Sequence, residues 1–205
     1  MPPPLSGWTI WITGFVGKAP ALDEFMSFLA SDFFIPVLIC LIMLTLWLSQ
    51  SDRFKREKIQ RAVMNTAVAI GISTLGVHIV NTFWDPWPRP FLVDDPAILE
   101  SARHAAQTVF YFAHDPSFPS NATTIAFAAA TGIFLGNRKV GILVYVLATC
   151  WAMARLYAGI HFFVDILAGV ALGVLIALFI CKVFMPRMEP FPSWAMNLFR
   201  FLYLA

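Results

Sequence analysis

Hydrophobic and polar positions are grouped in long blocks along this chain, without the two-residue alternation of half-buried strands. Four apolar runs contain few charges, at 34–49, 62–84, 140–158 and 162–181. A fifth run at 121–136 is shorter and richer in alanine and threonine. Each run approaches the roughly 17–25 residues that a helix needs to cross a bilayer. The pattern predicts an all-α integral membrane protein, a bundle of five to six transmembrane helices.

Two flanking segments mix apolar and charged positions. Residues 5–32 place Asp23 and Asp32 among phenylalanine, methionine and leucine, which is typical of a helix lying in the lipid headgroups. The tail from 191 to 205 has a similar character and leaves open either an interfacial helix or a sixth span. No long linker or repeat divides the chain, so we predict a single membrane-embedded domain over 1–205.

Composition supports a membrane protein, and charge predicts its orientation. Hydrophobic residues make up 59% of the chain and charged residues 13%, with a mean hydropathy of +0.73, which is too apolar for one soluble core. If successive loops alternate sides, nine of the fourteen basic residues share one side, which the positive-inside rule makes cytoplasmic. These residues are Arg53, Lys55, Arg56, Lys58, Arg61, Arg138, Lys139, Lys182 and Arg187. Because these basic residues lie in loops that set the membrane orientation, they give no support to nucleic-acid binding.

The unusual polar residues gather on the predicted outer side. His161 and Asp165 open the last apolar run four residues apart, about 6 Å along one helix face. The carboxylate could then accept a hydrogen bond from one imidazole nitrogen and leave the other available as a nucleophile. A purely structural His–Asp pair is the alternative, and the pair alone does not decide between them.

Three further residues on this side suit an anion. Ser120 follows a proline and is the predicted N-cap of a helix over the run 121–136. The first backbone amides of such a helix can bind phosphate. The guanidinium groups of Arg89 and Arg155 match phosphate oxygens. An ordinary helix cap and a headgroup-anchoring arginine are the alternatives. Together with His161, these residues favour phosphoryl transfer.

No metal and no cofactor are predicted. Histidine, cysteine and carboxylate residues do not cluster at ligand spacing, and Asp115 is typical of an exposed loop charge. The three cysteines lie inside apolar runs, where they favour packing roles.

Three segments, PRPF at 88–91, SFPSNATT at 117–124 and ARLYAGIHFFVD at 154–165, resemble the signature motifs of the type 2 phosphatidic acid phosphatase superfamily of integral-membrane lipid phosphatases. The motif region covers 85–165. Within that superfamily the motif sequences are most similar to those of the bacitracin-resistance type of undecaprenyl-diphosphate phosphatase. Many relatives carry a lysine seven residues before the first-motif arginine, and this chain has Thr82 there.

The resemblance implies a role for each matching position. His161 would attack the terminal phosphorus and become a phosphohistidine, while Asp165 holds its imidazole. The residues implied to bind the phosphate are Arg89 with Pro90, Ser120, Asn121 and Arg155.

Ala122 stands where the family carries the histidine that protonates the leaving group, and alanine cannot donate a proton. An inactivating substitution in an otherwise intact site and natural degeneration both explain it. His114 is the nearest substitute acid in sequence, although a plain loop histidine explains it equally well. We expect impaired activity.

The resemblance implies dephosphorylation of undecaprenyl diphosphate to undecaprenyl phosphate and phosphate, in the bacterial inner membrane with the site facing outward. The expected partners are a polyprenyl diphosphate or another lipid phosphate and the surrounding membrane lipids, and the oligomeric state is left open. A phosphatidic acid or phosphatidylglycerol phosphate phosphatase and a non-catalytic phospholipid-binding pseudoenzyme are the alternatives.

Overall fold

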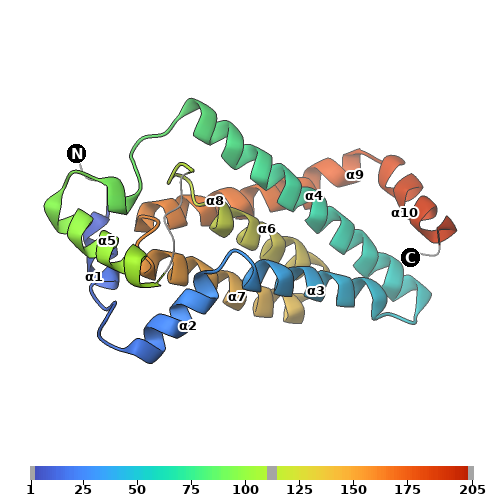
Figure 1. Ribbon diagram of the computed structural model, residues 1–205. Helices are drawn as coiled ribbons and strands as arrows, with labels where there is room; N and C mark the ends of the chain where they lie inside the picture. The colour runs from blue at the N-terminus through green and yellow to red at the C-terminus, as the bar shows by residue number, and fades with distance from the viewer. Residues whose placement is uncertain (1–2, 110–114, 203–205) are drawn as a thin grey trace.

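The structure, a computed structural model, describes residues 3–109 and 115–202, and within these ranges the chain forms helices and no strand (Figure 1). The predicted all-α class is confirmed. The elements are α1 (Ser6–Thr13), α2 (Pro20–Ala30), α3 (Phe34–Leu48), α4 (Arg53–Phe83), the 3₁₀ turn η1 (Pro90–Leu92), α5 (Pro96–Val109), α6 (Asn121–Gly136), α7 (Arg138–Tyr157), α8 (Phe163–Phe179), the π-helical η2 (Ile180–Phe184), α9 (Met185–Arg187) and α10 (Phe191–Phe201).

The five apolar runs form α3, α4, α6, α7 and α8. Four of these helices lie close to their predicted bounds, whereas α4 begins at Arg53, nine residues before the predicted run. Among the described residues, α4, α7 and the continuous helix 163–187 are each long and apolar enough to cross a membrane. Helices α2 and α3 could form a fourth span with a bend of 53°. The shorter α6 lies in the centre of the bundle and contacts α4, α7 and α8 (Figure 1).

Small residues allow α6 to lie at the centre. Ala126, Ala128 and Ala130 are fully buried on α6, and glycines of α8 face its first turns. A Cβ atom on Gly173 would lie 2.3 Å from the carbonyl oxygen of Thr124. Small residues let membrane helices approach closely, so this contact fixes the start of α8 against the start of α6.

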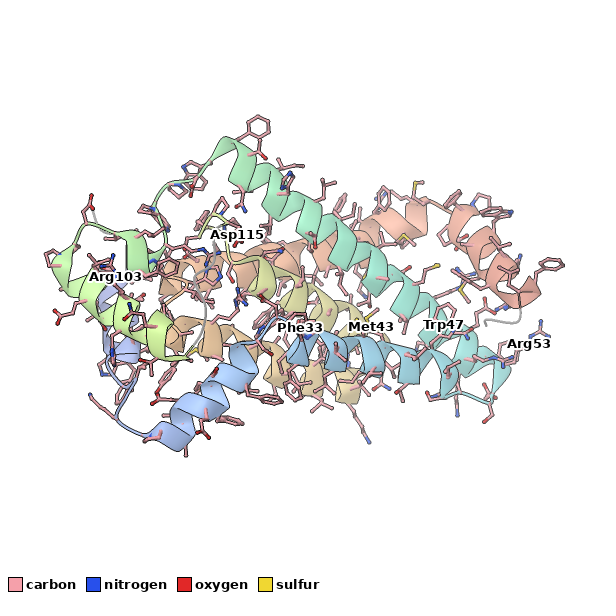
Figure 2. All side chains as sticks on the ribbon, in the orientation of Figure 1. Phe33, Met43, Trp47, Arg53, Arg103 and Asp115 are labelled. Atoms are coloured by element: carbon pink, nitrogen blue, oxygen red, sulfur yellow. The ribbon has the colours of Figure 1, made fainter. Side chains whose placement is uncertain are left out.

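The two ends of the bundle differ in chemistry. Helix α4 ends, α6 begins, α7 ends and α8 begins at one end, which α1 and α5 cover (Figure 1). At the opposite end, α4 begins at Arg53 and α7 begins at Arg138. Figure 2 shows Asp115 and Arg53 at these opposite ends. The basic loops therefore lie far from the predicted site.

The N-terminal and C-terminal segments each form short helices. Residues 5–32 contain α1 and α2, because Gly17 turns the chain at a φ of +80° and Pro20 begins a new helix. The tail helix α10 has 11 residues, about 17 Å, which is shorter than a bilayer core. The tail thus forms an amphipathic helix and no sixth span within 191–202.

We predict that Gly173→Ala lowers the free energy of unfolding by about 1–3 kcal/mol, because the new methyl group meets a backbone oxygen that cannot move independently of α6. Thermal unfolding in detergent micelles measures this. Gly71→Ala is the matched control, since a Cβ there meets nothing within 4 Å. Equal melting temperatures for the two variants would contradict the close α6–α8 contact.

Candidate active site

The carboxylate of Asp165 lies at the centre of the polar cluster and is fully buried in the first turn of α8. Its Oδ2 accepts hydrogen bonds from the backbone N–H of Phe162 at 2.8 Å and from the Ser117 hydroxyl at 2.6 Å. Its Oδ1 accepts one from the indole N–H of Trp87 at 3.0 Å. One carboxylate therefore joins three segments that are far apart in sequence.

His161 lies in the turn before α8, so the prediction that it shares a helix with Asp165 is wrong. Its Nδ1 is 3.7 Å from Asp165 Oδ2, beyond hydrogen-bond distance, and 3.0 Å from the carbonyl oxygen of Ser117. A carbonyl only accepts, so Nδ1 carries the proton and Nε2 bears the lone pair. Ser117 thus connects the two residues, with its carbonyl on the imidazole and its hydroxyl on the carboxylate.

Burial lowers the pKa of His161 to about 4, with the positive charges of Arg89 and Arg155 acting in the same direction and Asp165 opposing them. The imidazole is therefore neutral at pH 7. Neutral imidazole with its lone pair on Nε2 is the form that can attack phosphorus.

Arg89 precedes η1, where Pro90 is buried and turns the chain. Its Nε donates to the backbone carbonyl of Asp115 and one terminal nitrogen to that of Ile160, both at 2.7 Å. The other terminal nitrogen lies 2.9 Å from the Asp115 carboxylate. Burial lowers the pKa of Arg89 below its usual value, and Asp115 opposes that shift. Arg89 therefore holds the segments before α6 and α8 together beside His161.

Arg155 lies in the last turn of α7, as predicted, and is buried. Its Nη1 donates to the Asp32 carboxylate at 2.5 Å and to the Ala30 carbonyl at 3.4 Å. Its guanidinium group lies over the Trp151 ring, with 5.9 Å to the centroid. The arginine at the end of α7 thus reaches the break between α2 and α3.

The predicted N-cap of α6 is confirmed. The Ser120 hydroxyl accepts from the backbone N–H of Thr123 at 3.5 Å, and the Ser120 N–H donates to the backbone carbonyl of Asp165 at 3.2 Å. Asn121 is exposed in the first turn of α6, and Ala122 beside it is buried in the core. The positive end of α6 is therefore tied to the start of α8, next to His161.

A groove of about 400 Å³ opens beside this cluster, between α4 and the segment 115–121. Thr82, at the position of the family's lysine, lines it together with Asn81 and Asn121. Asn81 Oδ1 is buried in this groove and has no hydrogen-bond partner in the described part of the chain. The site thus borders a space with polar walls at the edge of α4.

The sequence did not predict a site role for four residues of the cluster. Trp87 and Ser117 donate hydrogen bonds to Asp165. Ser117 is the first residue of the segment 117–124, and Trp87 directly precedes the segment 88–91. Asp115 was expected to be a plain loop charge, and Asp32 was assigned only to a headgroup segment; both pair with arginines instead. Asp115 and Asp32 stand 26 and 123 positions from their arginines, so no local pattern in the sequence indicated these pairs. His114 lies outside the described residues.

Comparison with known proteins identifies the same superfamily that the three motif segments resemble. The PAP2 superfamily model matches residues 62–189. Undecaprenyl-diphosphatase BcrC of Bacillus subtilis is 26% identical over 178 residues, which cover 87% of this chain and 82% of BcrC. The crystal structure of Aquifex aeolicus LpxE has a TM-score of 0.60 at 26% identity, covering 86% of this chain and 93% of that one. A Bacillus subtilis PAP2 type phosphatidylglycerolphosphate phosphatase shares the fold, with a TM-score of 0.55 at 20% identity over 90% of this chain and 88% of its own.

The pKa of His161 generates a pH prediction. In the unfolded chain the imidazole protonates near pH 6.5, and in the folded chain near pH 4. The unfolded chain thus binds the additional proton inside this window, so the free energy of unfolding should decrease as the pH falls through it. NMR of the imidazole nitrogens in micelles, assigned with a His161→Gln variant, should show a neutral ring at about pH 5. A titration midpoint near 6.5 would contradict the buried neutral form.

Proposed function

Since the chain belongs to the PAP2 superfamily, we propose that it removes the terminal phosphate of a membrane lipid diphosphate. The proposed substrate is undecaprenyl diphosphate, and the products are undecaprenyl phosphate and inorganic phosphate. The likeness to BcrC, whose name states that activity, supports this choice of lipid. The observation that carries the proposal is the buried, neutral His161 at the end of the bundle, with the charges of two buried arginines acting on it.

The proposed reaction has two steps. The Nε2 lone pair of His161 attacks the terminal phosphorus, the bond from that phosphorus to the bridging oxygen breaks, and the lipid leaves as a monophosphate. Water then attacks the phosphohistidine, the P–N bond breaks, and inorganic phosphate leaves. The proton stays on Nδ1 throughout and is donated in a hydrogen bond to the Ser117 carbonyl oxygen, so a positive imidazolium develops beside Asp165 and is stabilised by it.

The amide end of α6 and the arginines are the proposed phosphate ligands. Ser120 and Asn121 lie at the N-terminus of α6, where backbone N–H groups and the helix dipole favour negative charge. Arg155 supplies a fixed guanidinium group from α7, and Arg89 supplies a second one from the segment before η1. Pro90 holds that segment in its turn.

The proposed orientation places this end of the bundle outside a bacterial inner membrane. The basic residues at the starts of α4 and α7 lie at the opposite end, which the positive-inside rule places in the cytoplasm. A lipid diphosphate released on the outer face would then reach the site within its own leaflet.

We predict that Ala122→His raises phosphate release from undecaprenyl diphosphate by about 10²-fold, the lower end of the usual contribution of a positioned general acid. Phosphate release in detergent micelles measures it, with His161→Ala as the blank. Transfer of ³²P from a terminally labelled substrate to His161 separates an impaired enzyme from a pseudoenzyme that only binds. If all three chains release no phosphate and none is labelled, on phosphatidic acid and phosphatidylglycerol phosphate as well, the catalytic proposal fails.

The missing acid should matter less for diphosphates than for monophosphates. A lipid phosphate leaves with little help from a proton, whereas an alkoxide requires one. The rate ratio between Ala122→His and the unmodified chain should therefore be about ten times or more larger on phosphatidic acid than on undecaprenyl diphosphate. Parallel assays of both substrates measure the two ratios. Equal ratios would show that leaving-group protonation is not the role of position 122.

A further inference from the structure

Each buried arginine of the site is paired with a more exposed aspartate. Arg155 Nη1 lies 2.5 Å from Asp32 Oδ1, and their side chains are 7% and 41% exposed. Arg89 Nη2 lies 2.9 Å from Asp115 Oδ1, with exposures of 2% and 65%. We propose that Asp32 and Asp115 are specificity-determining residues. They stay paired with the arginines when only phosphodiester lipids are present, and they release the arginines when a terminal phosphate binds. This inference rests on the proposed function.

Burial explains why each arginine needs a counter-charge. A guanidinium group removed from water without an anion is strongly unfavourable, so an empty site must supply one from the protein. A carboxylate offers two oxygens in nearly the geometry that a phosphate offers. Asp32 and Asp115 thus occupy the sites that the phosphate oxygens would take.

The difference in exposure indicates which partner can leave. Both arginines are buried. Each also donates to a backbone carbonyl, Arg89 to that of Ile160 and Arg155 to that of Ala30, which fixes their positions. The aspartates lie outside the helices, Asp32 at the break between α2 and α3 and Asp115, labelled in Figure 2, before α6. A carboxylate that is already partly hydrated can turn into water at little cost, while the arginine stays in place.

Charge then decides which ligand displaces them. The phosphodiester of an ordinary membrane lipid carries one negative charge, equal to that of the aspartate. A tethered carboxylate has a high effective concentration, so a diester gains nothing by replacing it. A terminal phosphate carries about −1.5 to −2 near neutral pH and has three terminal oxygens. It can therefore attract an arginine more strongly than the single charge of an aspartate does and displace that aspartate, while surrounding lipids are rejected.

A purely orienting role for the aspartates predicts the opposite result. If Asp32 and Asp115 only hold the arginines in place, neutralising either one misplaces a phosphate ligand and weakens phosphate binding. If they compete with the ligand, neutralising either one strengthens binding. The sign of the change in affinity therefore separates the two roles.

The experiment measures binding of inorganic phosphate at about pH 8 by calorimetry, in maltoside micelles with and without phosphatidylglycerol. Asp32→Asn and Asp115→Asn keep the side-chain shape and remove the charge. We expect each to bind phosphate about fivefold or more tightly in lipid-free micelles, and to lose most of that gain when phosphatidylglycerol is added. The unmodified chain should change by less than about twofold with the lipid.

Glu189→Gln is the matched control. Glu189 pairs with Arg61 at 2.7 Å on the far end of the bundle, so this variant makes the same charge change away from the site. It should leave phosphate affinity unaltered in both micelles. Thermal unfolding of each variant shows whether it is folded, and the two aspartates test the idea independently because they pair with different arginines.

The outcomes separate this inference from the proposed function. If the unmodified chain binds phosphate and neither Asn variant binds it more tightly, the competing role is wrong and the proposed function stands. Tighter binding by a variant without sensitivity to phosphatidylglycerol would reject the discrimination against diesters. If no chain binds phosphate in either micelle, both proposals fail. Binding by the Asn variants alone would show complete blocking by the aspartates and support the inference.

Discussion

The arrangement of the site depends on the burial of one charge, the Asp165 carboxylate. A fully buried carboxylate is strongly unfavourable unless hydrogen-bond donors replace water. The three donors come from Trp87, Ser117 and Phe162, and each belongs to a segment that also carries a site residue. Trp87 stands two residues before Arg89, and Phe162 follows His161 directly. Satisfying one carboxylate therefore positions His161 and Arg89, the proposed nucleophile and a proposed phosphate ligand, together.

The same electrostatic requirement shapes the rest of the cluster. Burial keeps the imidazole of His161 neutral, and the two nearby guanidinium groups act in the same direction. The guanidinium groups in turn donate to aspartates and backbone carbonyls. Helix packing sets the distances between these groups. The small residues of α6 and α8 bring the cap at Ser120 to the turn at His161. The hydrogen bonds and ion pairs of the cluster and the close packing of α6 and α8 therefore fix the same geometry.

The sequence predicted the apolar helices well because a long uncharged run has one stable arrangement in a bilayer. It also predicted which end of the bundle collects the polar residues, since chain direction alone determines that. It could not predict the contacts between segments distant in sequence. His161 was expected on the helix of Asp165, but the helix begins after it, and Ser117 connects the two. The partners of Arg89 and Arg155 lie 26 and 123 positions away, beyond the reach of any local pattern.

The position of Ala122 bears on the proposal that this chain is an impaired phosphatase. Ala122 is buried in the apolar core beside Asn121 and contributes no side-chain hydrogen bond to the network around Asp165. The residue at position 122 can therefore change without disturbing the contacts of His161 or of the two arginines. A chain drifting away from catalysis has no reason to keep a buried carboxylate, its three donors and two buried guanidinium groups, each of which is unfavourable when incomplete. The intact network around a single alanine favours an impaired phosphatase over a degenerate binding protein.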